Sequence, residues 1–111
     1  MSAIDTLLLS EYNKLSRNIL RLREECEQRP KGSIAVKRRG NRDYVYIVKR
    51  EKGKVVTKYV GREGTWKVKG AEAKIMERKR YSGELAEAEA QLAKIVKIMK
   101  AGGIIFVEPL S

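Results

Sequence analysis

The chain begins with apolar residues that recur at helical spacing. From position 8 to position 26 they are separated by alternating steps of four and three residues: Leu8, Tyr12, Leu15, Ile19, Leu22 and Cys26. This heptad pattern predicts a helix with one face against a partner helix. Pro30 and Gly32 follow, and proline lacks the N–H that would continue a helix. We therefore expect a helix over residues 3–29.

A second helical pattern covers residues 70–101, with a possible break near Ser82-Gly83. Its apolar positions repeat the same steps: Tyr81, Leu85, Ala88, Leu92, Ile95 and Met99. Each seam extends over about 27 Å at the rise of an α-helix. The chain leaves the first seam at residue 26 and returns to the second at residue 81, and the two seams are equal in length. We therefore expect them to pair antiparallel, as a coiled-coil-like helical hairpin. After it comes the tail 104–111, in which Ile104-Ile105-Phe106-Val107 has strand character but no identified partner.

Between the helices, over residues 33–61, the apolar period changes from helical to twofold. Three runs rich in β-branched and aromatic residues are separated by Gly40-Asn41 and by Glu51-Lys52-Gly53-Lys54. Short turns with glycine between such runs predict an antiparallel three-stranded meander. The middle run has apolar residues at both alternating sets of positions. It is therefore expected to be a central strand that packs on one face and presents tyrosines on the other.

Together these elements predict a single α+β domain, in which a helical hairpin carries the meander at its tip. Other apolar residues fall outside the two seams: Ile4, Leu7, Leu9, Ala86, Ala93, Val96 and Ile98. A two-helix seam leaves them uncovered. We therefore expect a homodimer that pairs through residues 3–29 and 83–100.

The positive charge of the chain is concentrated in one segment. The 111 residues carry a formal charge of +11. Residues 31–80 alone hold 17 Lys and Arg against 5 acids, whereas residues 1–30 balance at five and five. A protein that is basic only for solubility would spread its charge. The concentration indicates a surface that binds a polyanion.

Several classes of function are excluded by missing residue types. The chain has no histidine and one cysteine, Cys26, so zinc fingers, histidine general bases and cysteine–histidine pairs are absent. The lone cysteine fits a reducing cytoplasm. No apolar run is long enough to span a membrane, and the N-terminus lacks the features of a secretion signal. We expect a cytoplasmic, non-enzymatic protein without metal, cofactor, small-molecule substrate or membrane association.

Basic residues and tyrosines interleave along the predicted meander. The candidate nucleic-acid-binding residues are Lys37, Arg38, Arg39, Arg42, Tyr44, Tyr46, Lys49, Arg50, Lys54, Lys58 and Arg62. A narrow antiparallel sheet fits the major groove of duplex DNA. There arginine side chains can read guanine edges, and other basic side chains can hold phosphates. Double-stranded DNA is therefore the expected ligand. Trp66 is expected to anchor the polar connector before the second helix against the sheet.

The segment Gly32–Arg42, with Tyr44-Val45-Tyr46 and Gly53–Lys58 after it, resembles the arm-type DNA-binding domains of tyrosine recombinases. Lys58-Tyr59-Val60-Gly61 is similar to a hairpin end in N-terminal modules of some transposases, and the pattern also resembles short prokaryotic proteins of unknown function. The resemblance covers residues 32–80. It implies a sheet that enters the major groove with a helix behind it. Without a catalytic domain, it implies an accessory or regulatory binding module.

Two alternatives remain open. The same sheet would bind RNA if its tyrosines stack on bases, and substitution of Tyr44 or Tyr46 would then abolish binding. In the other alternative, the chain is an adaptor or antitoxin-like partner whose coiled coil and tail bind a protein. Co-purification of an acidic protein without nucleic acid would favour the adaptor.

Overall fold

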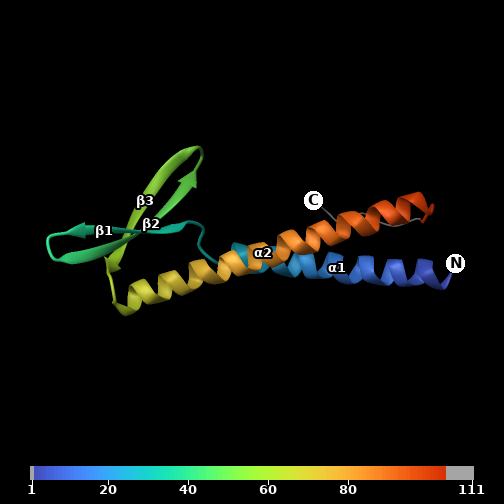
Figure 1. Ribbon diagram of the computed structural model, residues 1–111, viewed down its shortest axis with the longest axis horizontal. Coiled ribbons are helices and arrows are strands. Elements are labelled where there is room, and N and C mark those ends of the chain that lie inside the picture. The colour runs from blue at the N-terminus through green and yellow to red at the C-terminus, as the bar shows by residue number, and fades with distance from the viewer. Residues whose placement is uncertain (1, 105–111) are drawn as a thin grey trace. The chain divides into compact units, whose positions relative to one another are not determined.

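The computed structural model describes residues 2–104. The elements follow in the order α1 (Ala3–Glu27), β1 (Ser33–Arg39), β2 (Arg42–Glu51), β3 (Lys54–Arg62) and α2 (Trp66–Ala101) (Figure 1). The α+β class and the antiparallel meander are thereby confirmed. The chain forms two compact units: a hairpin unit, with the described residues up to Glu25 and from Tyr81 onward, and a sheet unit, Cys26–Arg80. The boundary between them crosses both helices, after Glu25 in α1 and before Tyr81 in α2.

The hairpin unit is held together by the two predicted seams. Its buried cluster consists of Tyr12, Ile19, Leu22, Ala88, Leu92 and Met99. Other seam residues pack against this cluster: Leu8, Leu15, Tyr81, Leu85 and Ile95. In Figure 1 the first residues of α1 lie beside the last turns of α2, so the two helices are antiparallel. The heptad spacing therefore identified the core of this unit correctly.

Local hydrogen bonds fix the start of α1 and the end of α2. At the start of α1 the N–H of Asp5 donates to Ser2 Oγ (3.1 Å), and the N–H of Ser2 donates to Asp5 Oδ2 (3.4 Å). This reciprocal cap satisfies two N–H groups that a helix start leaves unpaired. At the end of α2, Gly103 has a φ of 69°, and the N–H of Ile104 donates to the Met99 carbonyl (2.9 Å). Ile104 is the one residue of the predicted tail that lies within the described residues.

Part of the predicted homodimer surface belongs to the hairpin's own core. Leu9 and Val96 pack against the buried cluster. Ile4, Leu7 and Ile98 remain exposed. The homodimer stays a prediction, and these three are the side chains of its expected surface that remain exposed and large.

Helix α2 is longer than its apolar pattern predicts. It begins at Trp66, four residues before the expected start, and continues through Ser82-Gly83 without a break. Thr65 is its cap, since the N–H of Lys69 donates to the Thr65 carbonyl (3.1 Å) and closes the first helical turn. Among residues 2–104, no helix combines the length and apolar character needed to cross a membrane.

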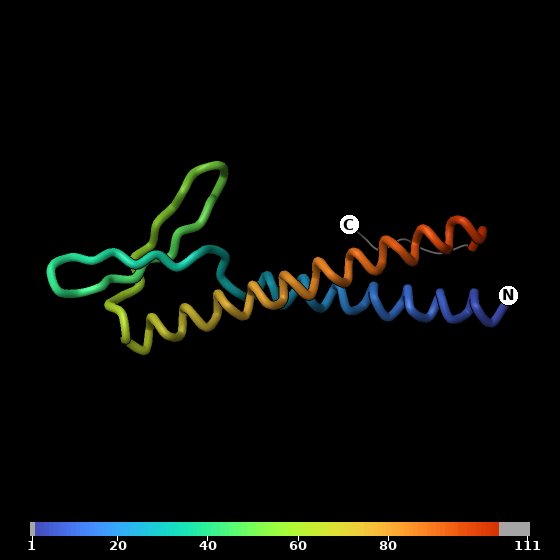
Figure 2. Tube along the Cα trace, viewed as in Figure 1, coloured from blue at the N-terminus to red at the C-terminus, as the bar shows by residue number. Residues whose placement is uncertain are grey.

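The sheet unit is built from two hairpins that share β2. β1 and β3 both pair with β2 in antiparallel register. Gly40 supplies a positive φ (63°) in the first turn, and Lys52 and Gly53 do so in the second (50° and 79°). The two turns lie at opposite ends of β2, and Figure 2 shows the two hairpin tips directed apart.

One face of the sheet is covered by the first turns of α2. Val45 of β2 is fully buried, as are Val68 and Ile75 of α2. Gly61 lies opposite Val45. A Cβ atom built on Gly61 would lie 3.4 Å from Val68 Cγ2, so the glycine allows the helix to approach closely. We call the side that carries Val45 the helix face. The opposite side, which carries Tyr44 and Tyr46, is the tyrosine face.

Candidate nucleic-acid interface

Three tyrosine rings pack together on the tyrosine face. The strand register places Tyr46 of β2 opposite Tyr59 of β3. Their ring centroids are 5.4 Å apart and the ring planes meet at 61°, while the Tyr44 and Tyr59 centroids are 6.3 Å apart. Such tilted and edge-to-face pairs are favourable. Tyr59 is 52% exposed, so the ring that joins the other two is accessible to a ligand.

Positive charge surrounds these rings. By register, the tyrosine face also carries Lys37, Arg39, Arg42, Arg50 and Arg62. The ammonium group of Lys37 lies 4.9 Å from the centroid of the Tyr46 ring, within the range of a cation–π contact. The two acidic residues of the strands, Asp43 and Glu51, fall on the helix face. The tyrosine face therefore has five basic side chains and no carboxylate among its strand residues.

The three tyrosines and one arginine line an open hollow. It has a volume of about 330 Å³ and is lined by Arg39, Tyr44, Tyr46 and Tyr59. Aromatic rings and the planar arginine head group are the surfaces on which nucleic-acid bases stack. The hollow can therefore accept a flat aromatic ring next to a positive charge.

The register divides the predicted site residues between the two faces. Seven lie on the tyrosine face: Lys37, Arg39, Arg42, Tyr44, Tyr46, Arg50 and Arg62. Four lie on the helix face: Arg38, Lys49, Lys54 and Lys58. Of these, Lys49 is paired with Glu51, with 2.7 Å between Nζ and Oε1. Because neighbouring strand residues point to opposite faces, Arg38 does not share a surface with Arg39 and Arg42.

A β-bulge in β3 brings Arg62 to the tyrosine face. Tyr46 pairs with Tyr59 and Val45 pairs with Gly61, which leaves Val60 as an extra residue. Under regular pairing Arg62 would lie opposite Asp43, on the helix face. The bulge instead places Arg62 opposite Tyr44. A glycine inside a strand often marks a bulge, so Gly61 was the available signal in the sequence.

Two aromatic residues differ from the sequence interpretation. Tyr59 was not among the predicted site residues, although it contacts both other tyrosines of the cluster. The prediction that Trp66 anchors a connector is wrong, because its side chain is 79% exposed. Trp66 is the first residue of α2, and Val68 faces the sheet two positions later. That rotation of about 200° around the helix directs Trp66 away from the sheet.

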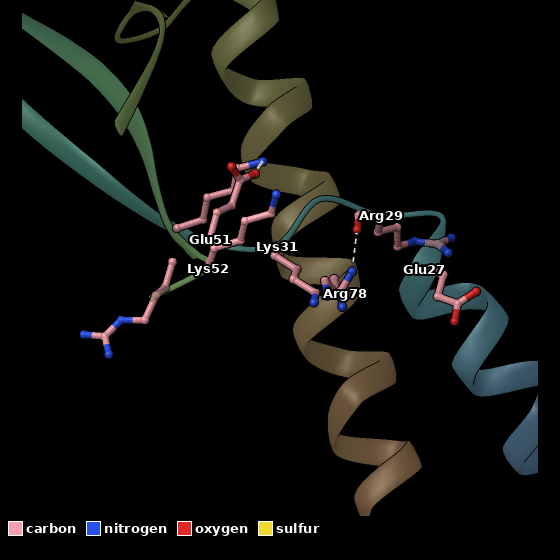
Figure 3. Close-up of a pocket in the computed structure, with 8 residues that line it drawn as sticks. Glu27, Arg29, Lys31, Glu51, Lys52 and Arg78 are labelled. Carbon is pink, nitrogen blue, oxygen red and sulfur yellow. Dashed lines mark hydrogen bonds and ion pairs between the residues drawn. The ribbon is translucent and has the colours of Figure 1, made fainter. Parts of the chain in front are cut away.

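The sheet unit also fixes the connector that follows α1. The Arg78 guanidinium donates to the carbonyls of Cys26 and Arg29. Figure 3 shows the second of these hydrogen bonds, which is 2.7 Å long. Arg29 Nε lies 2.8 Å from Glu77 Oε2. This hydrogen bond holds the pKa of Glu77 below its ordinary value. Arg78 thus occupies carbonyls at the end of α1, which stops at Glu27 rather than at the predicted residue 29.

A family model described as a domain of unknown function (DUF6788) matches residues 7–69, which is more than half of the chain. The matched segment contains most of α1 and all three strands, and it ends in the first turn of α2. It therefore includes the tyrosine face. No curated protein and no solved structure matches the chain.

Proposed function

This chain belongs to the DUF6788 family, and we propose that it is a non-enzymatic protein that binds nucleic acid through the tyrosine face, with duplex DNA as the first candidate ligand. One observation carries the proposal: the tyrosine face has the larger net positive charge. Its strand residues include five basic residues, three tyrosines and no carboxylate, whereas the helix face carries four basic residues together with both strand carboxylates. A sheet that used its charge only for solubility has no need of this difference between its faces.

The dimensions of the sheet support a duplex ligand. The outer strands of a three-stranded sheet lie about 10 Å apart, and the major groove of B-DNA is about 12 Å wide. Arg39 and Arg42 lie opposite each other beside the β1–β2 turn, and Arg62 lies across from Tyr44 nearby. Three arginine side chains are therefore located at one end of the tyrosine face. The resemblance to arm-type domains implies the same use of a three-stranded sheet with a helix behind it.

The experiment that tests this proposal is a fluorescence-anisotropy titration with labelled duplex DNA, single-stranded DNA and hairpin RNA, each at about 50 and 200 mM salt. We expect duplex DNA to bind most tightly. If all five basic side chains of the tyrosine face neutralise phosphates, a plot of log Kd against log salt concentration should have a slope of about 4.5 in magnitude. Weak and equal binding to all three probes, lost at the higher salt, would contradict the proposal.

A single-stranded nucleic acid is the second candidate, because the tyrosine cluster provides a stacking surface. Tyr59 is half exposed beside the open hollow that Arg39 helps to line. Duplex DNA keeps its bases stacked on each other, whereas a single strand offers them to aromatic side chains. The same titration separates the two candidates.

Substitution of Tyr59 tests the stacking surface directly. If unpaired bases stack on it, Tyr59→Ala should weaken binding of single-stranded DNA by about 1–3 kcal/mol, with a smaller effect on duplex DNA. Tyr59→Phe is the matched control, since it retains the ring and should retain the affinity. Equal losses in the two variants would show that the hydroxyl group, rather than stacking, makes the contact.

A further inference from the structure

A second basic hollow lies in the sheet unit, at the end of the tyrosine face that carries Arg50, which lines both. It is lined by the connector after α1, the end of β2 with its turn, and α2 (Figure 3). Its volume is about 660 Å³, and its lining has six basic and two acidic residues. Protein sites for small ligands commonly have volumes of about 300–1,000 Å³. The hollow is therefore large enough for several phosphate groups.

Half of the basic lining residues are held by contacts within the protein. Arg78 donates to the connector carbonyls, Arg29 is paired with Glu77, and Lys49 is paired with Glu51. These contacts shape the wall of the hollow. The other three basic side chains make no hydrogen bond or ion pair with any residue of the described range 2–104. They are Lys31, Arg50 and Lys52. Their charges repel each other unless an anion binds between them.

The backbone at Lys52 points to the same use. Within residues 2–104, Lys52 is the only residue other than glycine with a positive φ (50°), and Gly53 follows at 79°. Two positive φ values in a two-residue hairpin turn are typical of the type I′ turn, which prefers Asn or Gly at its first position. A lysine adopts this conformation at a cost. Despite this conformational cost, the turn has a lysine at this position, and its positive side chain lines the hollow.

We propose that this hollow binds the phosphate groups of a polyanion, with Lys31, Arg50 and Lys52 as the contacting side chains. Ammonium and guanidinium groups bind phosphate oxygens through charge-assisted hydrogen bonds. The inference does not rest on the proposed function of the tyrosine face, because a phosphate ligand needs no stacking surface. The phosphates belong either to a free polyphosphate or to the backbone of a nucleic acid.

The test is calorimetric titration of the full chain with sodium tripolyphosphate at constant ionic strength. We expect Lys52→Asn to weaken tripolyphosphate binding about tenfold and at the same time to raise the Tm, because asparagine fits the turn better. Opposite changes in affinity and stability exclude unfolding as the cause. Lys31→Gln, which leaves the turn unchanged, should weaken binding to a similar degree.

Arg39→Gln is the matched control, since it removes one charge from the tyrosine face and should leave tripolyphosphate affinity unchanged. Unchanged affinity in Lys52→Asn and Lys31→Gln, or an equal loss in Arg39→Gln, would overturn the proposal. Competition then identifies the source of the phosphates. Duplex DNA that displaces tripolyphosphate assigns the hollow to the nucleic-acid backbone, whereas simultaneous binding of both assigns it to a free polyphosphate. Failure of the tripolyphosphate test would leave the DNA titration of the tyrosine face unaffected.

Discussion

Replacing Arg39, Arg42 and Arg62 together by glutamine is expected to lower the affinity for duplex DNA by on the order of a hundredfold at low salt. The three arginines lie at one end of the tyrosine face, on three different strands. Each contact with a base or phosphate contributes about 1–3 kcal/mol if it is made. The same anisotropy titration measures the effect, and the magnitude of its salt slope should fall by about 2.7.

The sheet itself provides a control with the same change in charge. Arg38, Lys54 and Lys58 come from the same hairpins but lie on the helix face. Their triple glutamine variant should retain most of the DNA affinity. All six side chains are exposed, so neither triple variant should lower the Tm by more than a small amount. Equal losses of affinity in the two variants would show that total charge, and not the tyrosine face, determines binding.

The parts of the fold that were predictable from sequence follow from periodicity. The heptad seams identified Leu22 and Met99 as core residues, and both are fully buried. The twofold alternation of β2 predicted one packed and one tyrosine-bearing face, and Val45 occupies the packed one. Periodicity succeeds here because burial follows which face of an element a residue occupies, and the spacing in the sequence determines that face.

Other features depend on contacts between distant residues, which spacing does not show. The face of Arg62 depends on one extra residue in β3, and an alternation pattern cannot assign it before the pairing with β2 is known. The hydrogen bonds to the carbonyls of Cys26 and Arg29 at the end of α1 come from Arg78, which lies about fifty residues later in the chain. Trp66 looked like an anchor because large aromatic residues are commonly buried. Its position at the start of α2 instead leaves it exposed.

The candidate site was therefore predictable as a segment but not as a surface. Charge counting located it in residues 31–80. Separation into two faces required the register, which places Arg38 away from Arg39 and adds Tyr59 beside Tyr46. The hollow beside Lys52 is lined by three segments that are distant in the sequence: β2, α2 and the connector that follows α1. No local sequence pattern predicts that these segments lie side by side.

Leu22→Ala is expected to produce the largest loss of stability among the substitutions considered, about 2–5 kcal/mol in the free energy of unfolding. Leu22 is 1% exposed and belongs to the buried cluster of the hairpin unit. Removing its branched side chain takes away apolar contacts and leaves a cavity that the two helices cannot fully close. Urea denaturation followed by far-ultraviolet circular dichroism measures the change.

Leu20→Ala is the matched control, because it makes the same chemical change on the same helix at a side chain that is 56% exposed. We expect it to alter the free energy of unfolding by less than about 0.5 kcal/mol. A small effect of Leu22→Ala would contradict the heptad core of the hairpin. A large effect of Leu20→Ala would show that another surface, such as a second copy of the chain, covers this side of α1. Sedimentation equilibrium on the unaltered protein would then distinguish a dimer from a 12.7 kDa monomer.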